Sequence, residues 1–261
     1  CSDKICLQAA FNHLHIFIDP NPNPEQAFAE RQRLFDAQQS GWDQYNTELL
    51  SQGGGIFLRS AKSIQLTPEI KECFGIEADE LTPNALIKAI LKAPVDLFWN
   101  GGIGTYVKAE CESDASVGDR ANDALRVNGS EFGAKVVGEG GNLGLTQLGR
   151  VEFSLNGGRC NTDFIDNAAG VDCSDHEVNI KILLQQLLQN GHIDDDKRTE
   201  ILYSMTDSVS NLVLQNNYRQ AQAISLAEVD AEARDTEYQR LISHFEQQGA
   251  LNRELEFIPV S

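Results

Sequence analysis

The sequence lacks the features that would place it in a membrane or on a nucleic acid. It has no apolar run approaching the ~18–20 residues of a membrane-spanning helix, and no basic-then-apolar signal peptide opens it. Basic residues are also scarce: 21 Lys and Arg stand against 39 Asp and Glu, a formal net charge of −18. Because such a surface repels phosphate backbones, we expect no nucleic-acid partner and no membrane association.

Paired cysteines are also missing. The six cysteines include no C-x-x-C pair and stand at Cys1, Cys6, Cys73, Cys111, Cys160 and Cys173. In 261 residues this scatter favours reduced thiols in a cytoplasmic protein over a disulfide framework. No Cys/His set completes a zinc tetrahedron, so we expect no metal site. The chain opens on Cys1 rather than Met, which favours an excerpt of a longer polypeptide.

The usual phosphate-binding loops are absent as well. The sequence holds no G-x-x-x-x-G-K-[ST] motif, and its G-x-G at Gly102 and Gly104 continues with Thr105, Tyr106 and Val107 instead of a third glycine. A lone G-x-G is a weak signal, so these loops alone identify no nucleotide site.

What is present is a repeated alternation of short apolar runs with glycine- and asparagine-rich turns. Residues 7–11 and 16–18 predict buried strands, and strands are also predicted at 95–99, 134–138 and 162–165. Strands that alternate with turns and helices are typical of an α/β fold with a parallel sheet. From Asp175 onward, apolar residues at helical spacing predict a helical tail.

The turns after these strands are candidate ligand sites. Ligands of open parallel sheets bind beyond the carboxyl ends of the strands. Glycine allows close approach to the backbone, and asparagine offers a donor and an acceptor that suit ribose hydroxyls and a carboxamide. Glycine and asparagine are also common turn formers, so the pattern alone leaves both interpretations open.

The segment 173–177 (CSDHE) concentrates a thiol, a hydroxyl, an imidazole and two carboxylates. The spacing of Ser174 and Glu177 matches an S-x-x-E capping box, which predicts a helix start here rather than a metal or nucleophile site.

Four long segments resemble the large bacterial NAD-specific glutamate dehydrogenases: 96–108 (DLFWNGGIGTYVK), 118–123 (GDRAND), 137–147 (VGEGGNLGLTQ) and 161–177 (NTDFIDNAAGVDCSDHE). Two shorter stretches, EGGN at 139–142 and NAAGV at 167–171, resemble the E-G-A-N and N-A-G-G-V turns of smaller amino-acid dehydrogenases. Ala169 replaces a glycine of the second turn.

This resemblance implies an α/β fold with an incomplete Rossmann-like parallel sheet over residues 1–172, followed by a helical C-terminal subdomain over 173–261. It implies NAD as cofactor, L-glutamate and 2-oxoglutarate as substrate and product, and a cytoplasmic, homo-oligomeric parent enzyme. The implied cofactor-binding residues are Asn12 at the ribose-selecting strand end, Asn100 and Gly101 on the adenosine side, Asn142 at the nicotinamide-side ribose and Asn167 at the nicotinamide. Gly102 is a further implied cofactor-binding residue. Val171 and Ser174 are the implied substrate contacts.

The family's glycine-rich phosphate loop, catalytic lysines and catalytic aspartate match no segment of this chain. The sequence therefore predicts no catalytic residue here and no activity of the chain by itself. Two alternatives stay open: a dehydrogenase for another amino acid, and a non-catalytic nucleotide-sensing or interaction module of the same fold.

Overall fold

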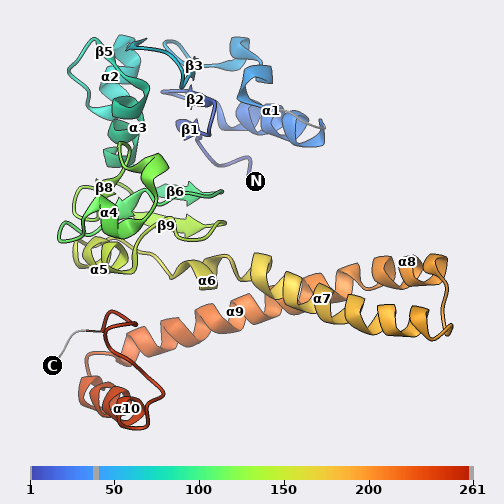
Figure 1. Cartoon of the computed structure of the whole chain (residues 1–261). Helices are drawn as coiled ribbons and strands as arrows, with labels where there is room; N and C mark the ends of the chain where they lie inside the picture. Colours follow the sequence, from blue (N-terminus) through green and yellow to red (C-terminus); the bar gives the residue numbers. More distant parts are fainter. Residues whose placement is uncertain (1, 38–40, 259–261) are drawn as a thin grey trace. The chain divides into compact units, whose positions relative to one another are not determined.

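The computed structural model describes residues 2–37 and 41–258. The chain is a mixture of helices and short strands, which confirms the α/β class (Figure 1). It divides into two compact units. Unit 1 comprises Cys1–Phe98, Gly104–Val136 and Gly149–Arg159; unit 2 comprises Trp99–Ile103, Val137–Leu148 and Cys160–Ser261. The predicted division at residue 172 stays a prediction.

The strands of the described residues pair in small separate sheets. The first sheet is antiparallel, with the order β1–β2–β3. A second antiparallel pair joins β4 to β5, β6 pairs with β9, and β7 pairs in parallel with β8. The strands are β1 (Ala9–Phe11), β2 (His15–Ile18), β3 (Gly55–Leu58), β4 (Ile64–Gln65), β5 (Glu80–Leu81), β6 (Leu97–Asn100), β7 (Val107–Lys108), β8 (Val127–Asn128) and β9 (Val136–Glu139).

The expected parallel order is wrong for the first strands, and Asn12 provides the reason. Its Oδ1 accepts the backbone N–H groups of Leu14 and His15, each at 2.8 Å, and its own N–H donates to the carbonyl of His15. This closes a tight turn, whereas parallel strands need a crossover of a dozen or more residues. Asn12 does end the first strand, as the sequence predicts.

Two helices of the first half begin at a Thr-Pro sequence, which is typical of a helix start. Thr67 and Thr82 are N-caps whose hydroxyls accept the N–H of Ile70 and Ala85, each at 3.3 Å, and proline follows each cap. The helices are α1 (Pro24–Asp36), α2 (Pro68–Phe74), α3 (Pro83–Lys92), α4 (Asp114–Val117) and α5 (Gln147–Leu155), with 3₁₀ helices at Trp42–Gln44, Thr47–Leu49 and Arg120–Asn122.

A buried arginine organises the segment around α4. The guanidinium of Arg126 is fully buried and binds the carboxylates of Asp114 (2.7 Å) and Asp123 (2.8 Å) through Nη1. It also donates to the carbonyls of Thr105 (3.0 Å) and Asp119 (2.7 Å). Burial acts to lower the pKa of Arg126, but the hydrogen bonds that it donates to Asp123 and Asp114 outweigh burial and raise the pKa. The GDRAND segment noted above therefore supplies part of a buried ionic cluster.

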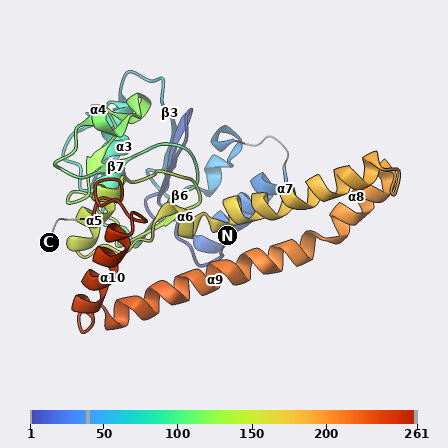
Figure 2. The ribbon, with the colours of Figure 1, turned by 60° about the horizontal axis from the view of Figure 1, so that its bottom comes forward.

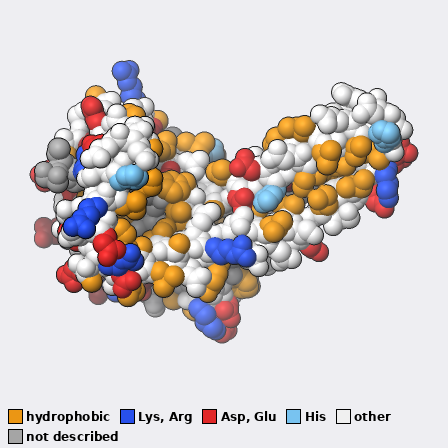
Figure 3. Space-filling view, turned by 90° about the horizontal axis from the view of Figure 1, so that it is seen from below, with side chains coloured by type: hydrophobic (Ala, Val, Ile, Leu, Met, Phe, Trp, Pro, Cys, Tyr) orange, Lys and Arg blue, Asp and Glu red, His pale blue; other side chains and the backbone are white. Residues whose placement is uncertain are grey.

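Unit 2 consists mainly of helices. α9 packs along α7 (Figure 2). Figure 3 shows hydrophobic side chains along this helical pair. The exposed large hydrophobic residues of the two helices include Val178, Ile182 and Leu212. None of the helices among the described residues combines the length and apolar composition that crossing a membrane requires. The helices are α6 (Asp163–Asp166), α7 (Ala168–Gln189), α8 (Asp195–Ser204), α9 (Thr206–Asp230) and α10 (Asp235–Gln247).

Two local predictions in this region are wrong. Residues 162–165 form no strand, because the N–H groups of Ile165 and Asp166 both bond back to the carbonyl of Thr162 and start α6. The capping box at 174–177 is also wrong, since α7 begins earlier, after Asn167. Inside the helix, Glu177 instead pairs with Lys181 at 2.9 Å, one turn on.

Candidate functional site

Three turns of unit 2 meet: the first turn (100–103), the second turn (139–144) and the third turn (161–168). The first two are joined through the backbone carbonyl of Asn100, which accepts the N–H of Gly140 at 2.8 Å and of Gly141 at 3.2 Å. The carbonyl ends β6, and its two donors follow the end of β9, the strand beside it (Figure 1). The pairing of these strands therefore brings together turns that are some forty residues apart in sequence.

The glycines of the first two turns differ in what surrounds them. A Cβ atom at position 141 would overlap the backbone carbonyl of Gly102, so only glycine lets the two turns approach this closely. At Gly102 itself, by contrast, an added Cβ would meet no atom within 4 Å. Gly102 thus faces open space, where a ligand can reach its backbone.

The two asparagines assigned to the nicotinamide side lie in direct contact. The Nδ2 of Asn167 donates to the Oδ1 of Asn142 at 2.8 Å. Asn142 is exposed and Asn167 is half-buried. The sequence predicts both as site residues, and the structure brings them together from turns 25 residues apart.

Three carboxylates that the sequence analysis did not single out fasten these turns. The Oδ2 of Asp166 accepts the N–H of Glu139 at 3.1 Å, and the Oδ2 of Asp163 accepts the N–H of Leu143 at 2.7 Å. Glu139 is itself fully buried, and its Oε1 accepts the N–H of Gly144 at 2.8 Å. A carboxylate that accepts a backbone N–H fixes that turn strongly. The sequence does show acidic residues beside these turns. It does not show which backbone groups they bind, because the partners of Asp163 and Asp166 are far away in sequence.

Leu143 shows that the second turn is held in an unusual backbone conformation. Its φ of 60° lies in the left-handed region, which non-glycine residues seldom adopt. Strain of this kind persists only where surrounding contacts impose it. The hydrogen bond that the N–H of Leu143 donates to Asp163 is one contact that holds this conformation.

The side chain of Asn100 is buried, with 4% of its surface exposed. Among the described residues its Nδ2 has no hydrogen-bond partner, and a Cβ at Gly144 would overlap that atom. Asn100 therefore meets the second turn through its carbonyl and packs its amide beneath Gly144. A side-chain contact from Asn100 to a ribose stays a prediction.

The remaining predicted site residues lie in three different places. Val171 and Ser174 are exposed on α7, three residues apart and so on one helix face. Asn12 belongs to unit 1, where its Oδ1 closes the β1–β2 turn. Gly101 lies in the first turn, and a Cβ there would come within 3.3 Å of the indole nitrogen of Trp99.

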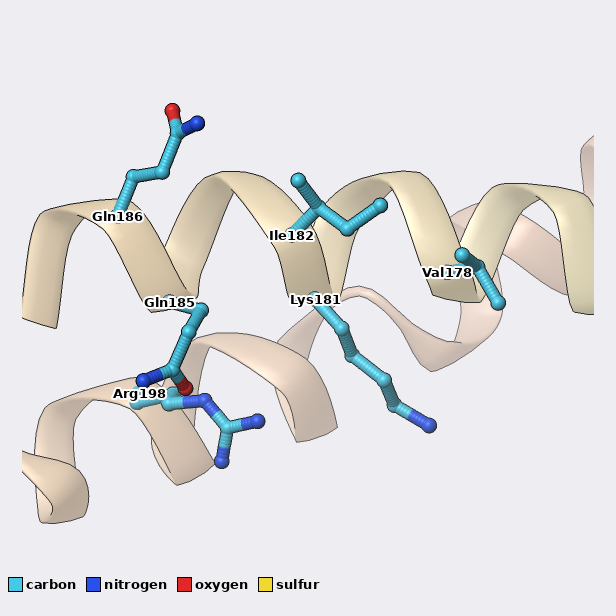
Figure 4. Close-up of a pocket in the computed structure, with 6 residues that line it drawn as sticks. All are labelled: Val178, Lys181, Ile182, Gln185, Gln186 and Arg198. Carbon is cyan, nitrogen blue, oxygen red and sulfur yellow. The ribbon is translucent and has the colours of Figure 1, made fainter.

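A separate hollow lies between α7 and α8 and contains no residue of the three turns (Figure 4). Among the described residues, no group of three or more His, Cys, Asp or Glu side chains is arranged to hold a metal ion. The hollow is lined by Val178, Lys181, Ile182, Gln185, Gln186 and Arg198.

Comparison with known proteins gives one consistent result. The family model described as "Bacterial NAD-glutamate dehydrogenase, catalytic domain" matches residues 1–227. Proteins named NAD-specific glutamate dehydrogenase are 63% identical to the chain in Pseudomonas aeruginosa, 60% in Halomonas elongata and 51% in Mycobacterium tuberculosis. Each match covers 99% of this chain but only 16% of the relative, so the chain spans about a sixth of the length of these relatives.

Proposed function

Since the chain belongs to the bacterial NAD-glutamate dehydrogenase catalytic-domain family, we propose that its three turns form part of the NAD site of a longer glutamate dehydrogenase. The observation that carries this proposal is the hydrogen bond between Asn142 and Asn167. It places two amides, each with donor and acceptor capacity, at the edge of turns that glycine keeps open. The incomplete Rossmann-like sheet over residues 1–172 belongs to the same proposal.

The proposed reaction converts L-glutamate, NAD and water to 2-oxoglutarate, ammonia and NADH. Bound NAD supplies the hydride acceptor, and the protein binds and orients the reactants. We assign Asn142 to a ribose hydroxyl and Asn167 to the nicotinamide carboxamide. Val171 and Ser174 are assigned to the substrate from the family resemblance, and both are exposed on one face of α7.

The groups that transfer protons are assigned to parts of the longer polypeptide outside these residues. We therefore expect the purified 261-residue chain to show no glutamate-dependent reduction of NAD, because a general base and an electrophilic lysine are missing from the proposed site. Measurable turnover by this chain, followed as NADH absorbance, would contradict the assignment.

Calorimetric titration of NAD into the same chain, with NADP as the control, separates two possibilities. Binding weaker than millimolar is expected if a phosphate loop elsewhere provides most of the affinity. Micromolar, NAD-selective binding would instead favour the nucleotide-sensing module. Cytoplasmic location and homo-oligomerisation stay predictions of the sequence.

The substitution Asn167→Ala tests the nicotinamide assignment in the full-length enzyme. We expect kcat to fall by at least ~10-fold, because a misplaced nicotinamide ring loses the reactive geometry. Asn179→Ala is the matched control. Asn179 is an exposed asparagine on α7 whose side chain donates to the carbonyl of Asp175, one turn earlier in the same helix. Equal kinetics for the two variants would remove Asn167 from the site.

A further inference from the structure

Trp99 presents a large aromatic surface beside the three turns. It lies in β6, immediately before the first turn, and 61% of its surface is exposed. An indole buries much of its area in most folded proteins, so an exposed one at a candidate ligand site is informative. The resemblance assigned no role to this residue.

The inner face of the indole rests on glycine. A Cβ added at Gly138 would lie 2.8 Å from the Cε3 of Trp99, and one at Gly140 would lie 2.7 Å from its Cζ2. Any larger residue at either position would therefore displace the ring. The two glycines seat the indole flat against β9 and the start of the second turn, and its other face stays open.

We propose that the open face of Trp99 stacks on a planar heteroaromatic ring of the bound dinucleotide. The inference rests on the proposed function and adds a positioning residue to it. The ring lies beside Gly101, because a Cβ added there would come within 3.3 Å of the indole nitrogen. Trp99 therefore lies next to the exposed backbone of the first turn. Stacking of a base on an aromatic side chain contributes substantially to nucleotide affinity. Adenine and nicotinamide share the required chemistry, and the experiment distinguishes them.

A purely structural role is the competing explanation. Cross-strand aromatic residues shield glycines in β-sheets and so stabilise the sheet. That role predicts a loss of stability when Trp99 is replaced, but no selective effect on one half of the dinucleotide. The two explanations therefore differ in ligand binding.

The test uses the full-length enzyme and the variants Trp99→Leu and Trp99→Phe. For Trp99→Leu we expect the Kd for NAD to rise about 10-fold, while the KM for glutamate stays unchanged. Trp99→Phe keeps an aromatic face and is expected to recover most of the affinity. Tyr203→Leu is the matched control, because Tyr203 is an exposed aromatic residue (77%) on α8, away from the turns.

Competition by AMP and by nicotinamide mononucleotide identifies the stacked ring. Weakened inhibition by AMP alone assigns adenine to Trp99, and weakened inhibition by the mononucleotide alone assigns nicotinamide. If wild type and Trp99→Leu bind NAD and both halves equally, the stacking proposal is wrong while the NAD site stands. If wild type itself binds no NAD, the proposed function fails, and this inference fails with it.

Discussion

Replacing Gly141 with alanine is expected to cost the enzyme about 100-fold in kcat/KM for NAD and to destabilise the chain by about 1–3 kcal/mol. The added methyl would overlap the carbonyl of Gly102, which is backbone and cannot rotate away. The first and second turns must then separate, which weakens the hydrogen bonds that the N–H groups of Gly140 and Gly141 donate to the carbonyl of Asn100. Steady-state kinetics of the full-length enzyme and denaturant unfolding of this chain measure the two effects.

Gly102→Ala provides the matched stability control. It adds the same methyl in the neighbouring turn, where nothing lies within 4 Å. We expect its unfolding free energy to equal that of the wild type, whereas its affinity for NAD falls if the open side of Gly102 receives the ligand. Equal destabilisation by both substitutions would show that the close approach of the two turns is not what requires glycine at 141.

Arg126→Met is expected to destabilise unit 1 by about 1–3 kcal/mol, because it removes a buried hydrogen-bond donor from two carbonyls and the shared cation from carboxylates that are partly exposed. The variant leaves Asp114 and Asp123 without their shared cation and the carbonyls of Thr105 and Asp119 without a donor. Urea unfolding followed by circular dichroism measures the loss. Arg234→Met is the control, because Arg234 pairs with Glu237 at the surface, and its loss should change stability by less than about 1 kcal/mol.

The Arg126 cluster also predicts a pH dependence. Burial acts to raise the pKa of Asp119, but the N–H of Thr105, the amide of Asn122 and the charge of Arg126 outweigh it and lower the pKa. A carboxyl whose pKa is lowered by folding stabilises fully above its unfolded value, about 3.9, and loses this effect as the pH falls through the folded value. The stability difference between wild type and Arg126→Met should therefore shrink below about pH 4. A difference that stays constant from pH 7 to pH 3 would exclude a charge-based role for the cluster.

Local sequence signals predicted local structure well. The caps at Thr67 and Thr82 were identifiable because a hydroxyl, a proline and a following helical pattern stand within a few residues of one another. Gly191 is also a local signal, because a glycine after a helical pattern is typical of a helix end. It follows the end of α7 in the left-handed conformation that glycine adopts readily. The family motifs implied that Asn142 and Asn167 belong to one site, but nothing in the sequence predicts the hydrogen bond between them.

The errors arise from hydrogen bonds that an apolar pattern does not show, some of them local and some between residues far apart in sequence. An apolar run predicts a strand but not its direction, and the Asn12 turn determined the direction of β2. Residues 162–165 form helix rather than strand, and the acidic residues of α6 bond to the backbone of the second turn. The sequence alone could not assign the roles of three carboxylates. Asp163 and Asp166 bind backbone groups twenty or more residues away, and Glu139 binds a backbone group within its own buried turn.

The order in which unit 2 is assembled along the chain has a consequence for biosynthesis. The first two turns of unit 2 precede α5 in the sequence, whereas the third turn and its supporting helices follow α5. Asn217 on α9 donates to the carbonyl of Ile165 in the third turn at 2.7 Å. Because the chain emerges from the ribosome N-terminus first, unit 1 can be complete before the residues of the third turn and α9 have been synthesised. The asparagine pair can therefore form only after residue 167 has been synthesised, and a nascent chain halted before α9 would lack the α9 contact that supports the third turn.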